Sequence, residues 1–142
     1  GRSNGGLLVG NMFARSPGRF GALVGEVPLL DMRVYHQLLA GASWIDEYGD
    51  PDIPEEWAGL SKFSPYHMVS EWGKQAPIRI PPVLFTTSTR DDRVHPCHAR
   101  KMVSRLQAMA AGKEGAAAVQ ELQGKAFLFE SSEGGHGGAT SI

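Results

Sequence analysis

The sequence has 142 residues, a formal net charge of −1, 42% hydrophobic residues and 20% charged residues. This length is enough for one modest hydrophobic core, and the charge gives no excess of Lys and Arg for a nucleic-acid surface. No apolar run approaches the roughly 20 residues that span a bilayer. We therefore expect no nucleic-acid partner and no membrane partner.

The chain has a single cysteine, Cys97, which excludes an intramolecular disulfide framework and a zinc cluster built from cysteines. This cysteine usage agrees with a reducing compartment, and we expect a cytoplasmic location. A signal peptide before Gly1 stays open, because the true N-terminus can lie further upstream.

Hydrophobic patterning and the positions of proline and glycine predict alternating helices and strands. The clearest strand is PPVLFTTS, where proline precedes a compact apolar run suited to burial on both faces. Residues 96–110 suit a helix with proline in its first turn, where proline is well tolerated. The expected helices cover 5–15, 32–40, 54–60 and 96–110, and the expected strands cover 21–27, 81–88 and 126–130.

Two segments between these elements are expected to be connections. Residues 43–60 are acidic and contain proline, which predicts an irregular segment with a short helix only near its end. Residues 111–125 are rich in alanine and glycine and are expected to be in part helical. The alternation of helices and strands indicates an α/β fold with a parallel sheet, in one domain over 1–142.

The first five residues, Gly1-Arg2-Ser3-Asn4-Gly5, fit the G-x-S-x-G pattern of a nucleophile elbow. In such a turn between a strand and a helix, small flanking residues let the backbone fold tightly and the serine hydroxyl stands clear of the sheet. The helix that follows places its N-terminal amides near the site, where negative charge is favoured. Glycine and serine are also common in ordinary turns. The alternative to a nucleophile elbow is therefore a flexible, glycine-rich end of the chain.

A serine nucleophile of this kind requires an acid and then a histidine later in the chain, each in a loop past the C-terminal end of a strand. Asp91 and Asp92 follow the expected strand 81–88, and His136 follows the expected strand 126–130. The order and the placement therefore favour a serine hydrolase. Composition does not choose between the two aspartates.

Four segments carry a family resemblance: GRSNGGLLVG, SPYHMV, TRDDRVHP and EGGHGG. Together they resemble the catalytic domain of the prolyl oligopeptidase family of serine peptidases. The resemblance runs from Gly1 to about Gly138 and is least clear over 111–125. It implies the C-terminal portion of an α/β-hydrolase fold, a mainly parallel sheet with flanking helices, whose N-terminal strands and β-propeller are absent from this chain.

The resemblance also implies the catalytic roles. It places the nucleophile at Ser3 and the general base at His136, and it chooses Asp91 as the partner of the histidine. The backbone N–H of Asn4 matches one oxyanion donor, and the second donor, a tyrosine in the family, lies upstream of this chain. No metal and no organic cofactor is implied.

A substrate pocket follows from the same resemblance. Arg93 matches the arginine that binds a substrate carbonyl, and Trp44 matches the tryptophan that stacks on a proline ring. Leu29, Tyr48 and Val94 fall on other walls of the pocket. A flat indole suits a pyrrolidine ring because it offers a large apolar area with little rotamer entropy to lose. The implied function is hydrolysis of short peptides on the carboxyl side of proline.

Some features leave the specificity open. Arg2 departs from the glycine that the family usually has before the serine, although related oligopeptidases that cut after basic residues carry arginine there. A related acyl hydrolase therefore remains an alternative: an oligopeptidase B-like enzyme, a dipeptidyl- or acylaminoacyl-peptidase, or an esterase. A non-catalytic hydrolase-fold scaffold is the other. We also expect the 142 residues alone to be unstable and inactive without the missing strands and propeller.

The cysteine and the other histidines have separate expectations. Cys97 is either a reactive thiol near the active-site loop or an inert buried one. The other histidines show no spacing that converges with carboxylates on a metal site; they are His36, His67, His95 and His98.

Overall fold

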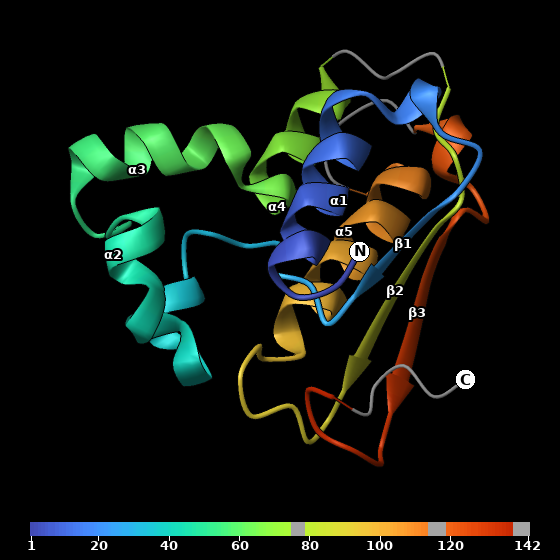
Figure 1. The fold of residues 1–142 in the computed structure, drawn as a ribbon. Helices are drawn as coiled ribbons and strands as arrows, with labels where there is room; N and C mark the ends of the chain where they lie inside the picture. Colours follow the sequence, from blue (N-terminus) through green and yellow to red (C-terminus); the bar gives the residue numbers. More distant parts are fainter. Residues whose placement is uncertain (75–78, 114–118, 138–142) are drawn as a thin grey trace.

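The computed structural model describes residues 1–74, 79–113 and 119–137. Within these residues, a parallel sheet has the strand order β1-β2-β3 (Figure 1). The strands are β1 (Leu23–Glu26), β2 (Val83–Ser88) and β3 (Ala126–Ser131). Their registers pair Leu23 with Val83 and Val83 with Ala126. The predicted strands and the predicted parallel sheet are confirmed.

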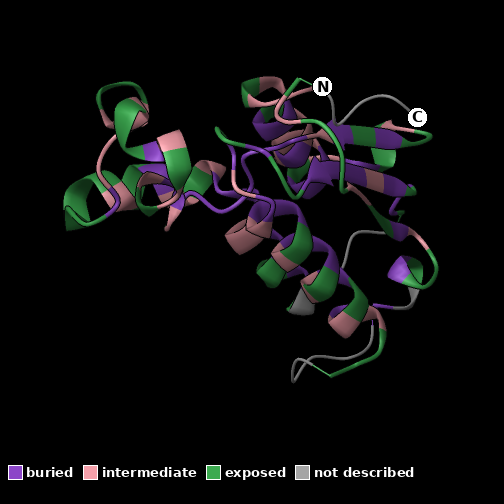
Figure 2. Cartoon of the chain, turned by 90° about the horizontal axis from the view of Figure 1, so that it is seen from below, coloured by how far each residue is buried: buried purple, intermediate pink, exposed green. Residues whose placement is uncertain are grey.

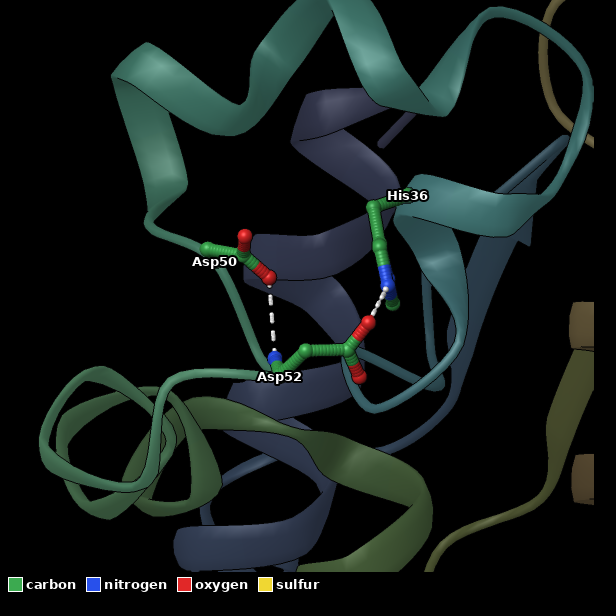
Figure 3. A group of neighbouring side chains, drawn as sticks. All are labelled: His36, Asp50 and Asp52. Carbon is green, nitrogen blue, oxygen red and sulfur yellow. Dashed lines mark hydrogen bonds and ion pairs between the residues drawn. The ribbon is translucent and has the colours of Figure 1, made fainter.

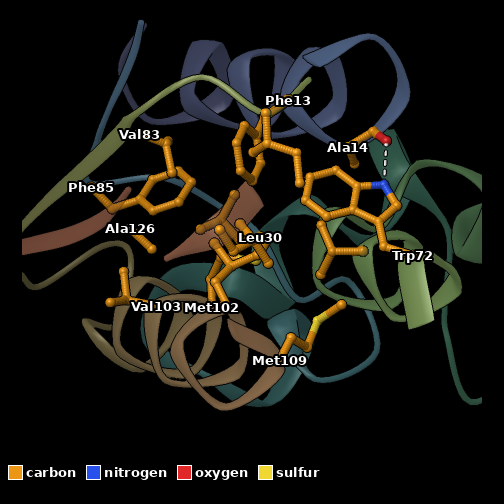
Figure 4. Packing of buried hydrophobic residues seen from close by; sticks show 14 of the residues in the cluster. Phe13, Ala14, Leu30, Trp72, Val83, Phe85, Met102, Val103, Met109 and Ala126 are labelled. Atoms are coloured by element: carbon orange, nitrogen blue, oxygen red, sulfur yellow. Dashed lines mark hydrogen bonds between the residues drawn. The ribbon is translucent and has the colours of Figure 1, made fainter. Parts of the chain in front are cut away.

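Two long helices cover one face of this sheet, α1 (Asn4–Arg15) and α5 (Cys97–Ala110). Both contribute to one hydrophobic core with β2, in which Phe13 and Phe85 are fully buried and meet edge to face at 6.4 Å. Trp72 also packs on Phe13, and its indole N–H donates to the carbonyl of Ala14 at 3.1 Å (Figure 4). Figure 2 shows the buried residues gathered between the sheet and the helices. The predicted helices over 5–15 and 96–110 are confirmed.

The opposite face of the sheet carries exposed apolar side chains. Val24, Leu84 and Phe127 are register partners and therefore lie side by side across the three strands. Val24 is 44% exposed and Phe127 is 49% exposed, and Phe129, two residues further along β3, is 39% exposed. In the described part of the chain, no helix covers this face (Figure 1).

A set of short helical segments lies to one side of the sheet and its two helices (Figure 1). It has its own hydrophobic cluster, centred on Tyr35, Met32 and Leu60. The predicted short helix over 54–60 is confirmed. The segments are η2 (Tyr35–Gln37), η3 (Leu39–Trp44), α2 (Ile45–Tyr48), α3 (Pro54–Leu60) and η4 (Ser61–Phe63). The next two, α4 (Pro65–Met68) and η5 (Val69–Gly73), lie instead beside α1 (Figure 1), where Val69 and Trp72 belong to the core between the sheet and its helices.

The helix predicted over 32–40 is wrong. The backbone is extended at Leu38 and left-handed at Leu39, with φ of 49°, so two 3₁₀ segments replace a continuous α-helix. Leu39 is also 50% exposed, and the apolar spacing there does not form one buried helical face. Of the connection predicted over 111–125, residues 114–118 lie outside the described residues. The described remainder includes η6 (Gln120–Leu122), and η1 (Pro17–Arg19) follows α1 where a break was expected.

Candidate active site

Ser3 lies in a strained turn between an extended segment and a helix. The N–H of Ser3 donates to the carbonyl of Glu26 at 2.9 Å, and the N–H of Glu26 donates to the carbonyl of Gly1 at 2.8 Å. Helix α1 begins at the next residue, Asn4. Ser3 has φ of 54° and ψ of −117°, a backbone conformation that L-residues adopt at a cost of order 1–3 kcal/mol and that is concentrated at functional sites.

The glycines around Ser3 have different roles. A Cβ on Gly1 would lie 2.5 Å from the carbonyl oxygen of Gly5, and a Cβ on Gly6 would lie 2.6 Å from the Cβ of Pro28. A Cβ on Gly5 would meet nothing within 4 Å. The close packing of this turn therefore requires glycine at positions 1 and 6, whereas the second glycine of the G-x-S-x-G pattern is sterically open.

Asp91 and His136 contact each other directly. The imidazole Nδ1 of His136 lies 3.0 Å from Oδ1 and 2.8 Å from Oδ2 of Asp91. Oδ1 also accepts hydrogen bonds from the backbone N–H groups of Arg93 and Val94, each at 2.9 Å. These donors fix the buried carboxylate, which in turn favours the tautomer with the proton on Nδ1 and leaves Nε2 free to accept one. Asp92, the other aspartate of this loop, is exposed.

The three predicted triad residues lie at the carboxyl ends of the strands. Asp91 is in the loop after β2 and His136 is in the loop after β3, and the N–H of Ser3 donates to the carbonyl of Glu26, the last residue of β1. Within residues 1–74, 79–113 and 119–137, the Ser3 hydroxyl makes no hydrogen bond to the imidazole. The Ser3 turn and the loop of His136 are instead joined by Arg2, whose guanidinium donates to the carbonyl oxygen of His136.

The predicted pocket residues come together beside the Ser3 turn. The Tyr48 hydroxyl donates to the side-chain oxygen of Asn4 at 2.6 Å, and the Arg93 guanidinium lies over the Trp44 ring at 5.9 Å. Trp44 and Tyr48 are partly buried and pack on the hydrophobic cluster that contains Leu29 and Val94, each only 2% exposed. Trp44 and Tyr48 thus keep part of their surface exposed, while the two aliphatic residues pack beneath them.

The tyrosines of this region are held in a protonated state. Burial, followed by the charge of Asp50, raises the pKa of Tyr35 to about 12, and its hydroxyl donates to the carbonyl of Gly49 at 2.6 Å. Burial, followed by the charge of Glu47, also raises the pKa of Tyr48. The ring of Tyr35 meets that of Tyr48 edge to face at 5.5 Å. A protonated hydroxyl on Tyr48 is what its hydrogen bond to an amide oxygen requires.

One cluster was not expected from the sequence spacing. His36 lies next to Asp50 and Asp52, and one ligand atom from each falls within 4.8 Å of the others (Figure 3). Nε2 of His36 is 2.9 Å from the Asp52 carboxylate, and the N–H of Asp52 donates to the Asp50 carboxylate at 2.9 Å. The histidine spacing did not indicate this contact between His36 and two carboxylates. The signal available in the sequence was the Asp-Pro-Asp turn, but nothing in the pattern links that turn to His36.

The arrangement matches a known protein family. The profile described as the prolyl oligopeptidase family matches residues 1–134. The chain belongs to the prolyl oligopeptidase family. Among the described residues, none of the helices has the length and apolar character needed to cross a bilayer.

Relatives in this family are much longer than the chain. The uncharacterized peptidase y4nA of Sinorhizobium fredii (strain NBRC 101917 / NGR234) is 42% identical over 142 residues, which is 100% of this chain and 17% of that protein. The dual function macrocyclase-peptidase POPB of Galerina marginata (strain CBS 339.88) is 41% identical over 108 residues, which is 75% of this chain and 14% of that protein. The chain therefore spans only a small part of the length of these relatives.

Solved structures of the prolyl oligopeptidase family share the fold. A structure from a study of two prolyl endopeptidases and their inter-domain dynamics has a TM-score of 0.79 at 42% identity, over 98% of this chain and 18% of that chain. A post-proline cleaving enzyme from Rickettsia typhi has a TM-score of 0.72 at 35% identity, over 96% of this chain and 17% of that chain. The predicted fold, a partial α/β-hydrolase fold, is confirmed.

Proposed function

We propose that the complete protein containing this chain is a serine-type peptidase that cleaves short peptides on the carboxyl side of proline. The observation that supports this most is the contact between Asp91 and His136 at the sheet edge where Ser3 occupies a strained turn. A buried carboxylate that orients an imidazole, close to a serine in such a turn, is the arrangement that makes an alcohol nucleophilic.

The chemistry follows from these groups. Oγ of Ser3 attacks the substrate carbonyl carbon while Nε2 of His136 accepts the hydroxyl proton, and Asp91 stabilises the imidazolium that forms. The backbone N–H of Asn4, at the N-terminus of α1, donates to the oxyanion. The imidazolium then gives its proton to the leaving amine, and water hydrolyses the acyl-enzyme in the second half of the cycle. Hydrogen bonds between nucleophile and base are often long in a substrate-free site and shorten when substrate binds.

Proline preference is supported by the pocket beside Ser3. Trp44 offers a partly exposed indole face, and the Arg93 guanidinium lies over that ring. In this proposal, Arg93 binds a carbonyl of the substrate. Apolar contact orders a pyrrolidine ring at little entropic cost, because proline is already rigid. Relatives of the family named prolyl endopeptidase or post-proline cleaving enzyme are consistent with this choice.

A second candidate is a related acyl hydrolase that prefers basic residues. The observation that favours it is the acidic character of α2, where Asp46 and Glu47 are exposed between Trp44 and Tyr48. Exposed carboxylates beside a pocket attract a cationic side chain, although salt screens such pairs.

The complete protein is also proposed to supply what this chain lacks. The chain spans 17% of the relative y4nA, and the sheet face with Val24, Phe127 and Phe129 is exposed. We place a further part of the hydrolase domain on that face, with a β-propeller that restricts access to short peptides and with a cytoplasmic location. Expressing the 142 residues alone tests this point, since a cooperative, high-temperature unfolding transition would contradict it.

Substrate profiling of the full-length protein tests the function. Three chromogenic peptides of equal length carry proline, arginine or acetyl-blocked alanine before the cleaved bond. We expect the highest kcat/KM for proline and no turnover by the Ser3→Ala variant. Highest activity on the arginine peptide would support the basic-residue alternative. No hydrolysis of any peptide by the parent protein would support a non-catalytic scaffold.

A further inference from the structure

We propose that Arg2 is a positioning residue that holds the loop of His136 against the Ser3 turn. This proposal rests on the proposed function, because it concerns the geometry between the base and the nucleophile. Arg2 stands directly before Ser3, and its guanidinium donates to the backbone carbonyl of His136, 134 residues away in the sequence.

The backbone at Arg2 is fixed by hydrogen bonds to β1. Its two neighbours hydrogen-bond to β1, with the carbonyl of Gly1 accepting from Glu26 at 2.8 Å and the N–H of Ser3 donating to Glu26 at 2.9 Å. Arg2 itself forms a parallel bridge with Glu26. The guanidinium therefore extends from a rigid strand segment that also carries the nucleophile.

The backbone of the loop that carries His136 has few conformational restrictions of its own. Apart from the Arg2 contact, its hydrogen bonds to other elements come, among the described residues, from the region of β2. The loop contains Gly134, Gly135 and Gly137, and Gly134 has a left-handed φ of 76°. Its other hydrogen bonds run to the end of β2 and to the loop that follows it: Ser88 Oγ donates to the carbonyl of Gly134 at 2.6 Å, and Asp91 binds the His136 ring. In the part of the chain that the structure describes, no other side chain of residues 1–4 is hydrogen-bonded to residues 132–137.

These contacts give Arg2 a specific consequence for the reaction. Asp91 orients the imidazole relative to the β2 loop, but it does not set the distance between that ring and Ser3. The Arg2 contact sets the position of the His136 backbone relative to the nucleophile turn. A guanidinium suits this task because its planar fork is pre-organised and its hydrogen bonds to oxygen are charge-assisted. Misplacing a catalytic group by about 1 Å can lower a rate by about 10²-fold.

The test compares Arg2→Met, Arg2→Gly and Arg2→Lys with the parent in the full-length protein. Two quantities are measured: the rate of labelling by a fluorophosphonate, and kcat and KM for the proline peptide. We expect Arg2→Met to lower the labelling rate and kcat by about tenfold with KM changed less than about twofold, and Arg2→Lys to fall between Arg2→Met and the parent. Arg90→Met is the matched control, because it removes an exposed arginine next to Asp91, and it should leave both rates unchanged.

Chemical rescue separates positioning from a loss of folding. Guanidinium or methylguanidinium at millimolar concentration should raise the labelling rate of Arg2→Gly several-fold, since it can occupy the vacated space and donate to the same carbonyl. The same salt should not raise the rate of Arg2→Met, whose side chain fills that space. Absence of rescue in Arg2→Gly, or equal labelling of Arg2→Met and the parent, would overturn the proposal for Arg2 while leaving the proposed function intact. Absence of labelling in the parent would instead overturn the proposed function.

Discussion

Both carboxylate oxygens of Asp91 contact Nδ1 of His136, at 3.0 and 2.8 Å. The two residues are 45 positions apart and come from loops after adjacent strands, so the parallel register of β2 and β3 brings them together. The carboxylate is held by two backbone N–H groups in its own loop. It is therefore oriented before any substrate binds.

The Asp91 contact predicts unequal effects for two adjacent aspartates. Replacing Asp91 by Asn removes the acceptor that fixes the histidine tautomer, and we expect kcat to fall by about 10⁴-fold, as in comparable triads. Asp92→Asn is the matched control, because this neighbour is exposed, and kcat should stay within about twofold of the parent. Steady-state kinetics of both full-length variants on the proline peptide checks this expectation. Equal effects of the two substitutions would refute the assignment of Asp91.

Trp44 is expected to set the preference for proline. Trp44→Ala removes the apolar surface next to Arg93, and the ratio of kcat/KM for a proline peptide to that for an alanine peptide should fall about 10- to 100-fold. Trp44→Phe keeps part of the aromatic face and should retain an intermediate ratio. The measurement is the ratio itself, because a general loss of stability lowers both rates together. An unchanged ratio in Trp44→Ala would rule out the indole as the proline-binding surface.

Tyr48 is expected to support the oxyanion donor through Asn4. Tyr48→Phe removes the 2.6 Å hydrogen bond to the Asn4 side chain. A typical hydrogen bond contributes about 1 kcal/mol, so we expect kcat to fall about fivefold with little change in KM. Tyr66→Phe is the control, since the Tyr66 ring stacks with Arg105 away from this turn. If the two variants have the same kcat, the Tyr48 contact does not contribute to catalysis.

His98 is expected to make stability depend on pH. Burial lowers the pKa of His98 to about 4, and its Nδ1 accepts a hydrogen bond from the backbone N–H of Asp31 at 3.1 Å. Because the folded pKa lies below the unfolded value of 6.5, the contribution to stability is complete above about pH 6.5 and is lost as pH falls toward 4. The shift corresponds to about 3 kcal/mol.

The matched variant for this expectation is His98→Asn, whose amide oxygen can accept from the same backbone N–H without titrating. Thermal unfolding of the full-length parent and variant is compared between pH 7 and pH 4.5. The parent should lose more stability than the variant over this interval. A parallel pH dependence in the two proteins would show that protonation of His98 does not contribute.

Local patterns predicted much of the fold. The strands 81–88 and 126–130 and the helices 5–15 and 96–110 were identifiable because apolar spacing and proline act within one element. The helix predicted over 32–40 was wrong because the local pattern did not determine the backbone there. Its apolar residues suit a helix, but Leu39 adopts a left-handed conformation that the pattern does not encode.

Contacts between distant parts of the chain were the hardest to predict. The order of serine, aspartate and histidine was readable, and the resemblance chose Asp91. The hydrogen bond from Arg2 to the carbonyl of His136 could not be predicted, because every residue has a backbone carbonyl and the sequence does not show which one accepts. The state of Cys97 also needed the structure: it is half-buried, and burial raises the pKa of its thiol, which indicates an unreactive cysteine.

The most direct test of the central claim is covalent labelling of the full-length protein with a fluorophosphonate, followed by mass spectrometry of its peptides. We expect one modified residue, Ser3, with labelling lost in Ser3→Ala and strongly slowed in His136→Ala. Modification of a different serine, or labelling of Ser3 at an unchanged rate without the imidazole of His136, would contradict the proposed nucleophile and base.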